Sequence, residues 1–339
     1  RFTYNSKKIK MKIRVLSGED VRRALPMKVA IQETKRAFDS LSSMKVEMPL
    51  RSRLNIPKND GVLLTMPAAL LDSGEIAVKV VTVFENNFSK NLPLIHAVVI
   101  VLDSENGEIL SLMDGEVLTA IRTGAGVGVA TDFLASPEAK TVAIIGSGRQ
   151  ARSQLEAVCT IRNIEHVRIY SPNNDHVQNF VREMSDSDKI PDDFNISHSS
   201  EEALKGADIV CTATNSISPV ISFDHLKRGA HVNAVGSFKP TMQEVDTKTI
   251  VNSLVVVDSL ESALLETGDI TIPIKKGLID QGHIFAEIGE IINGTKNIQY
   301  SPDQTTFFKS CGVAVQDLVT ASIALKNAKS MNLGTLATL

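Results

Sequence analysis

A short glycine-rich stretch has the residue types and spacing best suited to chemistry. Residues 141–145 are apolar or β-branched and predict a buried parallel strand. Gly146-Ser147-Gly148-Arg149-Gln150-Ala151 follows, and residues 150–161 are compatible with a helix. In this G-x-G-x-x-A pattern the first glycine makes a tight turn, the second lets the backbone approach a pyrophosphate at the helix N-terminus, and the alanine keeps helix and strand close. The alternative is an ordinary glycine-rich turn, but the flanking strand and helix favour a dinucleotide site.

Two cations stand in surroundings that suggest an anionic ligand. Lys79 lies within the otherwise apolar run 76–84, where a buried cation is costly unless it meets an anion. Alternation alone equally allows a strand residue on a solvated face. Arg122 precedes the small-residue run 123–128, which would let a backbone and a ligand approach closely. Because arginine can bind a carboxylate through two parallel hydrogen bonds, the pattern indicates a carboxylate site.

The N-terminal part, to about residue 125, predicts an α+β domain dominated by antiparallel sheet. Ser17 and Asp20 have the spacing of a capping box, and residues 26–41 have helical periodicity. Short strands are expected at 51–55, 61–66, 76–84 and 97–103, separated by turn signals such as Asn59-Asp60-Gly61.

The second part, residues 126–305, alternates strand and helix and predicts a doubly wound parallel α/β (Rossmann) sheet. Strands are expected at 141–145, 166–171, 194–197, 207–212, 231–235 and 254–257, with helices at 150–161, 175–184 and 200–205. A final helix at 313–332 follows the last sheet element. We therefore expect a Rossmann domain over 126–305 and a first domain over 1–125, completed by residues of about 306–339.

Composition narrows the function. The 339 residues suffice for about two domains. A net charge of −3 without a long basic run argues against nucleic-acid binding. The longest apolar run, 97–102, is too short to span a bilayer, so no membrane partner is expected. Three scattered cysteines favour a reducing, cytoplasmic location, and the seven histidines lack metal-ligand spacing, so no metal is expected. Residues 1–10 precede Met11 and are expected to be an extension rather than a folded element.

Four motifs together resemble the ornithine cyclodeaminase/μ-crystallin family. They are Ile121-Arg-Thr-Gly-Ala125, the glycine-rich pattern 146–151, His231-Val-Asn-Ala-Val-Gly236 and the run from Phe308 to Asp317. The similarity covers nearly everything from Ser17 to Gly334. The stretches 257–269 and 285–289 make the chain closer to the ketimine-reducing, μ-crystallin-like members than to the cyclodeaminases.

The resemblance implies a homodimer with a nicotinamide cofactor. It implies that the N-terminal domain serves dimerisation and that substrate binds between this domain and the Rossmann domain. Arg51, Lys79 and Arg122 fall on family positions that hold the carboxylate of an amino or imino acid. On sequence alone Arg53 is an equal candidate to Arg51, and either could be a solvated strand residue.

The same resemblance, with the strand pattern, gives the expected cofactor contacts. They follow successive strands and comprise Gly146, Ser147, Gly148, Arg149, Gln150, Ala151, Ser171, Asn173, Thr212, Thr214, Val235, Gly236 and Ser310. His96 is near the site in the family, although a satisfied strand histidine is the simpler interpretation. Asp317 either orients groups in the site or stabilises the start of the last helix.

One departure from the family pattern bears on the reaction. Cyclodeaminases carry an acidic residue shortly after the Asn-Ala-x-Gly motif, and this sequence has Phe238 there, beside the substrate. Without that carboxylate, loss of ammonia and ring closure lack a general base. We therefore expect reduction of a cyclic ketimine, Δ1-pyrroline-2-carboxylate or Δ1-piperideine-2-carboxylate, to L-proline or L-pipecolate, with Lys79 donating the proton directly or through water and Arg122 completing the catalytic pair.

Two other classes of function stay open at this stage. One is a different reaction of the family: alanine or N-alkyl amino-acid dehydrogenation, or cyclodeamination of ornithine. The other is a non-catalytic, μ-crystallin-like binding protein, against which the intact Arg51, Lys79 and Arg122 argue.

The second strand of the predicted Rossmann sheet indicates the cofactor. NAD-specific folds usually end this strand with Asp or Glu, which binds the ribose hydroxyls. Here Ser171 stands at that position, followed by Pro172-Asn173-Asn174. A serine removes the charge that would repel a 2′-phosphate, and Arg149 could supply positive charge. The sequence therefore predicts use of both cofactors with NADPH preferred over NADH, unless Ser171 is only a turn residue.

Overall fold

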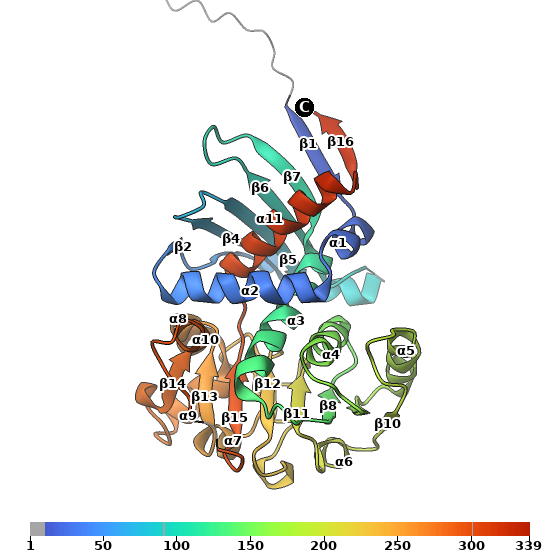
Figure 1. The fold of residues 1–339 in the computed structure, drawn as a ribbon, viewed down its shortest axis with the longest axis vertical. Helices are drawn as coiled ribbons and strands as arrows, with labels where there is room; N and C mark the ends of the chain where they lie inside the picture. Colours follow the sequence, from blue (N-terminus) through green and yellow to red (C-terminus); the bar gives the residue numbers. More distant parts are fainter. Residues whose placement is uncertain (1–10, 91, 300) are drawn as a thin grey trace, which may run out of the picture. The chain divides into compact units, whose positions relative to one another are not determined.

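The computed structural model describes residues 11–90, 92–299 and 301–339, and these form two compact units (Figure 1). Unit 1 contains the chain up to Pro26, Met44–Thr119 and Ala314–Leu339. Unit 2 contains Met27–Ser43 and Ala120–Val313. The prediction for residues 1–10 lies outside the described residues.

The limits of the units differ from the expected domain limits in three places. The chain passes into unit 2 at Ala120 rather than near 126, and it returns to unit 1 at Ala314 rather than near 306. The helix Met27–Ser42 belongs to unit 2 although it precedes the strands of unit 1 in sequence. Its buried residues, among them Ala30 and Phe38, explain this, because the helix packs against other helices of unit 2.

Unit 1 is built on a mostly antiparallel sheet. Its elements are β1 (Lys12–Leu16), α1 (Gly18–Ala24), β2 (Val46–Glu47), β3 (Ser52–Ile56), β4 (Gly61–Leu70), β5 (Ile76–Phe84), β6 (Ile95–Leu102), β7 (Ile109–Asp114), α11 (Ala314–Ser330) and β16 (Thr335–Thr338), with 3-10 turns at Pro57–Asn59 and Glu85–Lys90. The strand order is β16-β1-β7-β6-β5-β4-β2, and β3 also pairs with β4. The β1–β7 pair is parallel and the other pairs of this sheet are antiparallel.

Helix α11 covers the face of this sheet to which Lys79 belongs. It contacts β4, β5 and β6 and lies across them in Figure 1. Lys79 is buried on β5, and its neighbours in register, Met66 and Val99, are buried too. The structure therefore excludes the solvated face that alternation had left open for Lys79. Elsewhere in this unit, Ser17 and Asp20 form the predicted capping box at the start of α1.

Unit 2 is a doubly wound α/β unit with a parallel sheet. Its elements are α2 (Met27–Ser42), α3 (Gly115–Leu134, whose first residues belong to unit 1), β8 (Thr141–Ile145), α4 (Arg149–Ile161), β9 (His166–Tyr170), α5 (Asn174–Ser185), β10 (Phe194–Ile196), α6 (Ser200–Leu204), β11 (Ile209–Thr212), β12 (His231–Ala234), α7 (Thr247–Val251), β13 (Leu254–Val257), α8 (Leu260–Glu266), α9 (Gly268–Lys275), β14 (Ile284–Glu287), α10 (Ile288–Ile292) and β15 (Thr306–Lys309), with 3-10 turns at Phe223–His225 and Gln281–His283. The order is β10-β9-β8-β11-β12-β15-β13-β14. β15, which the sequence analysis did not predict, separates β12 from β13.

The sheet of unit 2 buries both of its faces. Ile144 and Ile169 pack with Leu155 of α4 in one core, whereas Ile145 and Val232 belong to a second core. Adjacent residues of β8 thus point into different cores, as expected for a strand covered on both sides. The strand order reverses between β8 and β11, and in such sheets ligands bind outside the carboxyl ends of the strands at this switch point.

Helix α3 uses its small residues for packing against other helices. A Cβ atom on Gly124 would lie 2.3 Å from the carbonyl oxygen of Ser153 in α4, and one on Gly128 would lie 2.7 Å from a side-chain carbon of Ile31 in α2. The small residues of the run 123–128 were expected to let a ligand approach closely. In the structure its glycines instead allow close contact between helices. By length and composition α3 could cross a membrane, but 83% of its most apolar window is buried in the protein, and buried core helices meet the same criterion.

Candidate functional site

The glycine-rich turn after β8 has a geometry that fits a pyrophosphate. Gly146 has φ +108°, and a Cβ atom there would lie 2.6 Å from the carbonyl oxygen of Ala213. Gly148 caps α4 without a side-chain hydrogen bond, and a Cβ atom there would meet nothing within 4 Å. Ala151 is fully buried. Because the helix start has open space and no capping side chain, its backbone N–H groups can donate hydrogen bonds to an anion.

Arg152 supports this turn, and sequence analysis had not singled it out. Its Nη1 donates to the carbonyl oxygens of Ser147 (2.6 Å) and Gly148 (3.2 Å), and its Nε donates to Glu183. It follows the six-residue motif directly, but the motif assigns no role to that position. Arg149 is exposed at the first position of α4.

The end of β9 combines an uncharged position with a helix cap. Ser171 is half-buried and follows the strand directly. Asn173 is the N-cap of α5, and its side-chain oxygen accepts a hydrogen bond from the backbone N–H of His176 at 3.0 Å. The amide oxygen of Asn173 therefore has a structural task, which leaves its amide nitrogen as the donor for a ligand.

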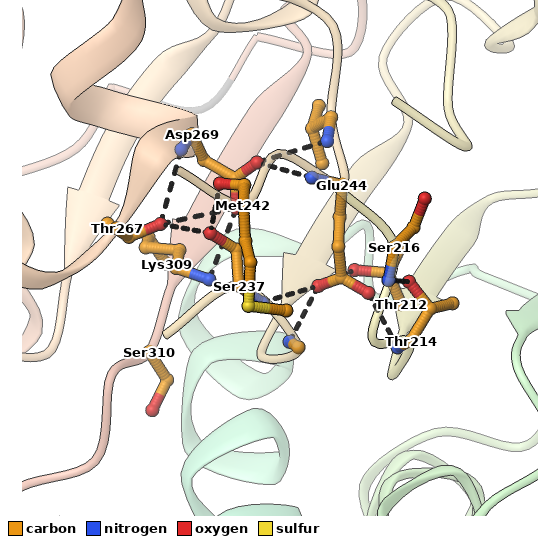
Figure 2. A network of polar contacts seen from close by, with 12 residues as sticks. Thr212, Thr214, Ser216, Ser237, Met242, Glu244, Thr267, Asp269, Lys309 and Ser310 are labelled. Atoms are coloured by element: carbon orange, nitrogen blue, oxygen red, sulfur yellow. Dashed lines mark hydrogen bonds and ion pairs between the residues drawn. The ribbon is translucent and has the colours of Figure 1, made fainter. Parts of the chain in front are cut away.

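The loops after β11 and β12 meet at a buried carboxylate, Glu244, which Figure 2 shows between them. Its oxygens accept hydrogen bonds from the Thr212 hydroxyl (3.0 Å) and from the backbone N–H groups of Thr214 (2.6 Å), Gly236 (2.6 Å) and Ser237 (3.1 Å). Thr212, Thr214 and Gly236 were predicted as cofactor contacts, whereas Glu244 was not singled out. The only sequence signal for it would have been an acidic residue inside the loop after β12.

A second buried carboxylate, Asp258, organises the turn after β15. Its Oδ2 accepts hydrogen bonds from the Ser310 hydroxyl (2.8 Å) and the Gly312 backbone N–H (2.7 Å). Gly312 has φ +79°, and a Cβ atom there would lie 2.5 Å from Nη1 of Arg122. The guanidinium of Arg122, which is 5% exposed, therefore lies against a turn that Asp258 holds. The hydroxyl of Ser310, expected near the cofactor, is bonded to Asp258.

In unit 1, Lys79 forms a buried ion pair. Its Nζ lies 2.7 Å from Oδ2 of Asp317 in α11, and the two side chains are only 3% and 2% exposed. The sequence allowed two interpretations of Asp317, either orienting groups in the site or stabilising the start of the last helix. In the structure its carboxylate pairs with Lys79. The buried cation thus has the anion that its position requires.

The other candidates lie in more open places. Arg51 is half-buried just before β3, while Arg53 is exposed and its Nε donates to Asn55 at 2.9 Å. Phe238 is 48% exposed and lies 5.5 Å from Nζ of Lys239. The side chain of His96 is 55% exposed and lies 3.8 Å from Glu116. Among the residues that the structure describes, no group of three His, Cys, Asp or Glu side chains could hold a metal ion.

The Lys79–Asp317 pair makes a stability prediction. Asp317→Leu should lower the free energy of unfolding by about 3–5 kcal/mol, because it leaves a cation in the core of unit 1 without its ion-pair partner. The double variant Lys79→Met, Asp317→Leu should recover most of that loss, since two apolar side chains replace the two charges. Urea unfolding of the four proteins in this cycle measures both effects. A single variant as stable as the parent protein would contradict the prediction.

The sequence and the fold of this chain are similar to those of known proteins. The profile of the ornithine cyclodeaminase/mu-crystallin family matches residues 11–332. A Δ1-pyrroline-2-carboxylate reductase of Bacillus cereus is 38% identical over 325 residues, covering 94% of this chain and 98% of that protein. The solved Δ1-pyrroline-2-carboxylate reductase of Thermococcus litoralis, in complex with NADH and L-proline, is 40% identical with a TM-score of 0.91, covering 95% and 99% of the two chains.

A third similar protein has a different substrate. An archaeal alanine dehydrogenase dimer with bound NAD is 33% identical with a TM-score of 0.89, covering 96% of this chain and 99% of that one. The family profile spans nearly the whole chain, and the reductases match both units. With its Rossmann-type unit and nicotinamide-dependent relatives, the chain belongs to the ornithine cyclodeaminase/mu-crystallin family.

Proposed function

We propose that this protein is an NAD(P)H-dependent reductase of a cyclic ketimine carboxylate, converting Δ1-pyrroline-2-carboxylate or Δ1-piperideine-2-carboxylate to L-proline or L-pipecolate. We favour imine reduction over cyclodeamination chiefly because of position 238, where an exposed phenylalanine stands in place of the acidic residue of the cyclodeaminases. Membership of the family and similarity to two named reductases of this imine support it.

Besides binding the cofactor, the protein must supply only a proton and a positive charge for the substrate carboxylate. When bound, the nicotinamide supplies a hydride, and its pyrophosphate fits the turn Gly146–Ala151 and the start of α4. The imine nitrogen needs one proton and the substrate carboxylate needs a counter-charge. We assign the proton to Nζ of Lys79, which the ion pair with Asp317 holds in place.

We assign the carboxylate of the substrate to Arg122 and Arg51. The Arg122 guanidinium is almost fully buried against the Gly312 turn, so its orientation is constrained. A fixed guanidinium can bind a carboxylate through two parallel hydrogen bonds, which orients the imine carbon as well as binding it. Phe238 would contribute apolar surface for the ring of the substrate.

The function predicts a selectivity among substrates. With NADPH or NADH, the protein should oxidise the cofactor when Δ1-pyrroline-2-carboxylate or Δ1-piperideine-2-carboxylate is added, and it should do so much more slowly with pyruvate plus ammonia or methylamine. Ornithine should release little ammonia, because no acid stands at position 238. The initial rate of cofactor oxidation is measured by the loss of absorbance of the reduced cofactor. Ammonia release from ornithine is measured by a separate ammonia assay.

Arg122→Ala is the matched variant for this test. It should lower kcat/KM for the imine at least tenfold, about 1.4 kcal/mol, while cofactor affinity changes little. Ornithine turnover that rivals imine reduction would refute the proposed reaction. Unchanged imine kinetics in Arg122→Ala would remove that residue from the substrate site.

We also propose that both cofactors are used and that NADPH is preferred. Ser171 gives the end of β9 no negative charge, the amide nitrogen of Asn173 can donate, and Arg149 is exposed at the first position of α4. The solved relatives contain NADH and NAD, so the proposed preference for NADPH is argued from these three residues of this chain and not from the relatives.

The ratio of kcat/KM for the two cofactors with one imine tests the proposal. Ser171→Asp should shift this ratio toward NADH, because its carboxylate would repel the 2′-phosphate of NADPH. A more than tenfold preference for NADH in the parent protein would be incompatible with it.

We propose a homodimer that associates through unit 1. This unit exposes several large apolar side chains, namely Leu50, Leu54, Leu71, Leu92, Leu94 and Ile95. Such residues are common at subunit interfaces, and the archaeal relative is a dimer. Light scattering should give twice the chain mass of 36.7 kDa, and the monomer mass at micromolar concentration would contradict the proposal.

A cytoplasmic location is the last part of the proposal. Cys159, Cys211 and Cys311 are thiols rather than halves of a disulfide, as is usual in reducing compartments. A disulfide found in the protein isolated from its own cells would contradict it.

A further inference from the structure

Glu244 joins two loops that are far apart in the sequence. Its Oε1 accepts from the Thr214 N–H, and its Oε2 accepts from the Thr212 hydroxyl and the N–H groups of Gly236 and Ser237. The side chain is fully buried. Figure 2 shows it reaching between the loop after β11 and the loop after β12. One carboxylate therefore satisfies backbone donors at the ends of two neighbouring strands.

The hydrogen bonds around Glu244 favour its carboxylate form. Both of its oxygens receive hydrogen bonds, three of them from N–H groups that cannot accept. Burial raises the pKa of Glu244, and the positive charge of Lys309 offsets part of that rise. The ammonium of Lys309 is fully buried and lies 3.2 Å from Oδ2 of Asp269. Burial alone would lower the pKa of Lys309, but the negative charge of Asp269 outweighs it with contributions from Cys311 and Glu244.

Asp269 also fixes the backbone that carries Glu244. Its Oδ1 accepts hydrogen bonds from the N–H groups of Glu244 (2.8 Å) and Val245 (3.1 Å). The lysine at the end of β15 thus holds Asp269, Asp269 holds the backbone of residue 244, and the side chain of Glu244 holds the two loops. The three charged groups form one buried network.

The two loops lie at the place where this sheet should bind a dinucleotide. The glycine-rich turn after β8 meets the loop after β11, since a Cβ atom on Gly146 would lie 2.6 Å from the carbonyl oxygen of Ala213. The loop after β12 packs against the same loop, because a Cβ atom on Gly236 would lie 2.2 Å from the carbonyl oxygen of Thr214 and 2.4 Å from Glu244. Movement of Thr214 would therefore be transmitted to the phosphate-binding turn and to the loop after β12.

We propose that Glu244, held by Asp269 and Lys309, is a positioning residue that keeps the loops after β11 and β12 in the arrangement that binds the nicotinamide cofactor. This inference rests on the proposed function for its ligand. Glu244 does not contact the cofactor in this proposal and acts through the backbone of Thr214 and Gly236.

Glu244→Gln is the sharpest test because it changes almost nothing in size. A glutamine has one oxygen and one NH2 group, so at least one N–H donor of Thr214, Gly236 or Ser237 would face another donor. The loop must then shift to relieve the conflict. We expect the Kd for NADH, measured by isothermal titration calorimetry, to rise about tenfold or more, with a KM for NADH that follows it and a smaller change in kcat.

A matched control separates positioning from a general loss of stability. Thr306→Val removes the buried hydrogen bonds of Thr306 with the His231 ring (2.8 Å) and the Leu134 carbonyl oxygen (3.1 Å), at the amino ends of β12 and β15. This variant should lower Tm in thermal unfolding as Glu244→Gln does. It should leave the Kd for NADH within about twofold, because it acts at the opposite ends of the same strands.

Each outcome decides the question. A folded Glu244→Gln protein that binds NADH as the parent does, or an equal loss of affinity in Thr306→Val, would overturn the inference. If Glu244→Gln does not fold, Thr212→Val removes only the hydroxyl donor, and its Kd for NADH should rise about threefold; an unchanged Kd would overturn the inference as well. A parent protein that binds neither NADH nor NADPH would instead refute the proposed function, and the inference with it.

Discussion

The burial of charge at the carboxyl edge of the parallel sheet is the constraint on which unit 2 depends. A buried carboxylate is costly unless donors surround it, and here the donors are backbone N–H groups that would otherwise be unpaired at strand ends. Glu244 and Asp258 each satisfy at least two such groups. The same hydrogen bonds that offset the cost of burying the carboxylates therefore also hold the loops at this edge of the sheet.

Unit 1 also buries charge, in the single ion pair between Lys79 and Asp317. Lys79 stands on the face of β5 that α11 covers, between buried Met66 and Val99 on the neighbouring strands. The ion pair with Asp317 ties the helix to the middle of the sheet. Buried pairs of this kind often add little net stability, because the loss of hydration offsets the attraction. Under the proposed function the pair has another role, because it would hold Lys79 in place to deliver a proton.

Sequence patterns predicted the parts of this fold that are encoded locally. The strands 76–84, 141–145 and 254–257 have the predicted limits, and the capping box at Ser17 is present. α3 was not predicted, since it is apolar on most sides and carries the glycines 124 and 128, which lower helix propensity but allow close packing. β15 was not predicted either, and its place between β12 and β13 depends on tertiary pairing that no local pattern encodes.

The candidate site shows the same division. The glycine-rich turn could be predicted from its residue types and spacing. Residue type suggested Lys79 and Arg122 but left a solvated face open for Lys79, and only the family resemblance favoured Arg51 over Arg53. Glu244, Asp258 and Arg152 could not, because an acidic or basic residue in a loop or on a helix usually faces water. Only the fold shows that these three residues bind backbone groups of the loops that sequence analysis had identified.

The loop after β12 combines a hydrogen-bonded base with an exposed aromatic side chain. Ser237 donates its hydroxyl to the carbonyl oxygen of Met242 at 2.7 Å, which closes the short excursion 238–241 at its base. Glu244 binds the backbone on one side of this excursion, and Asp269 holds the other side. Phe238 begins this excursion and is half exposed, with no part in those hydrogen bonds. A change of residue there can therefore alter the chemistry offered to a substrate while leaving these hydrogen bonds in place. This separation gives a physical reason why reductases and cyclodeaminases can share one fold while differing at this position.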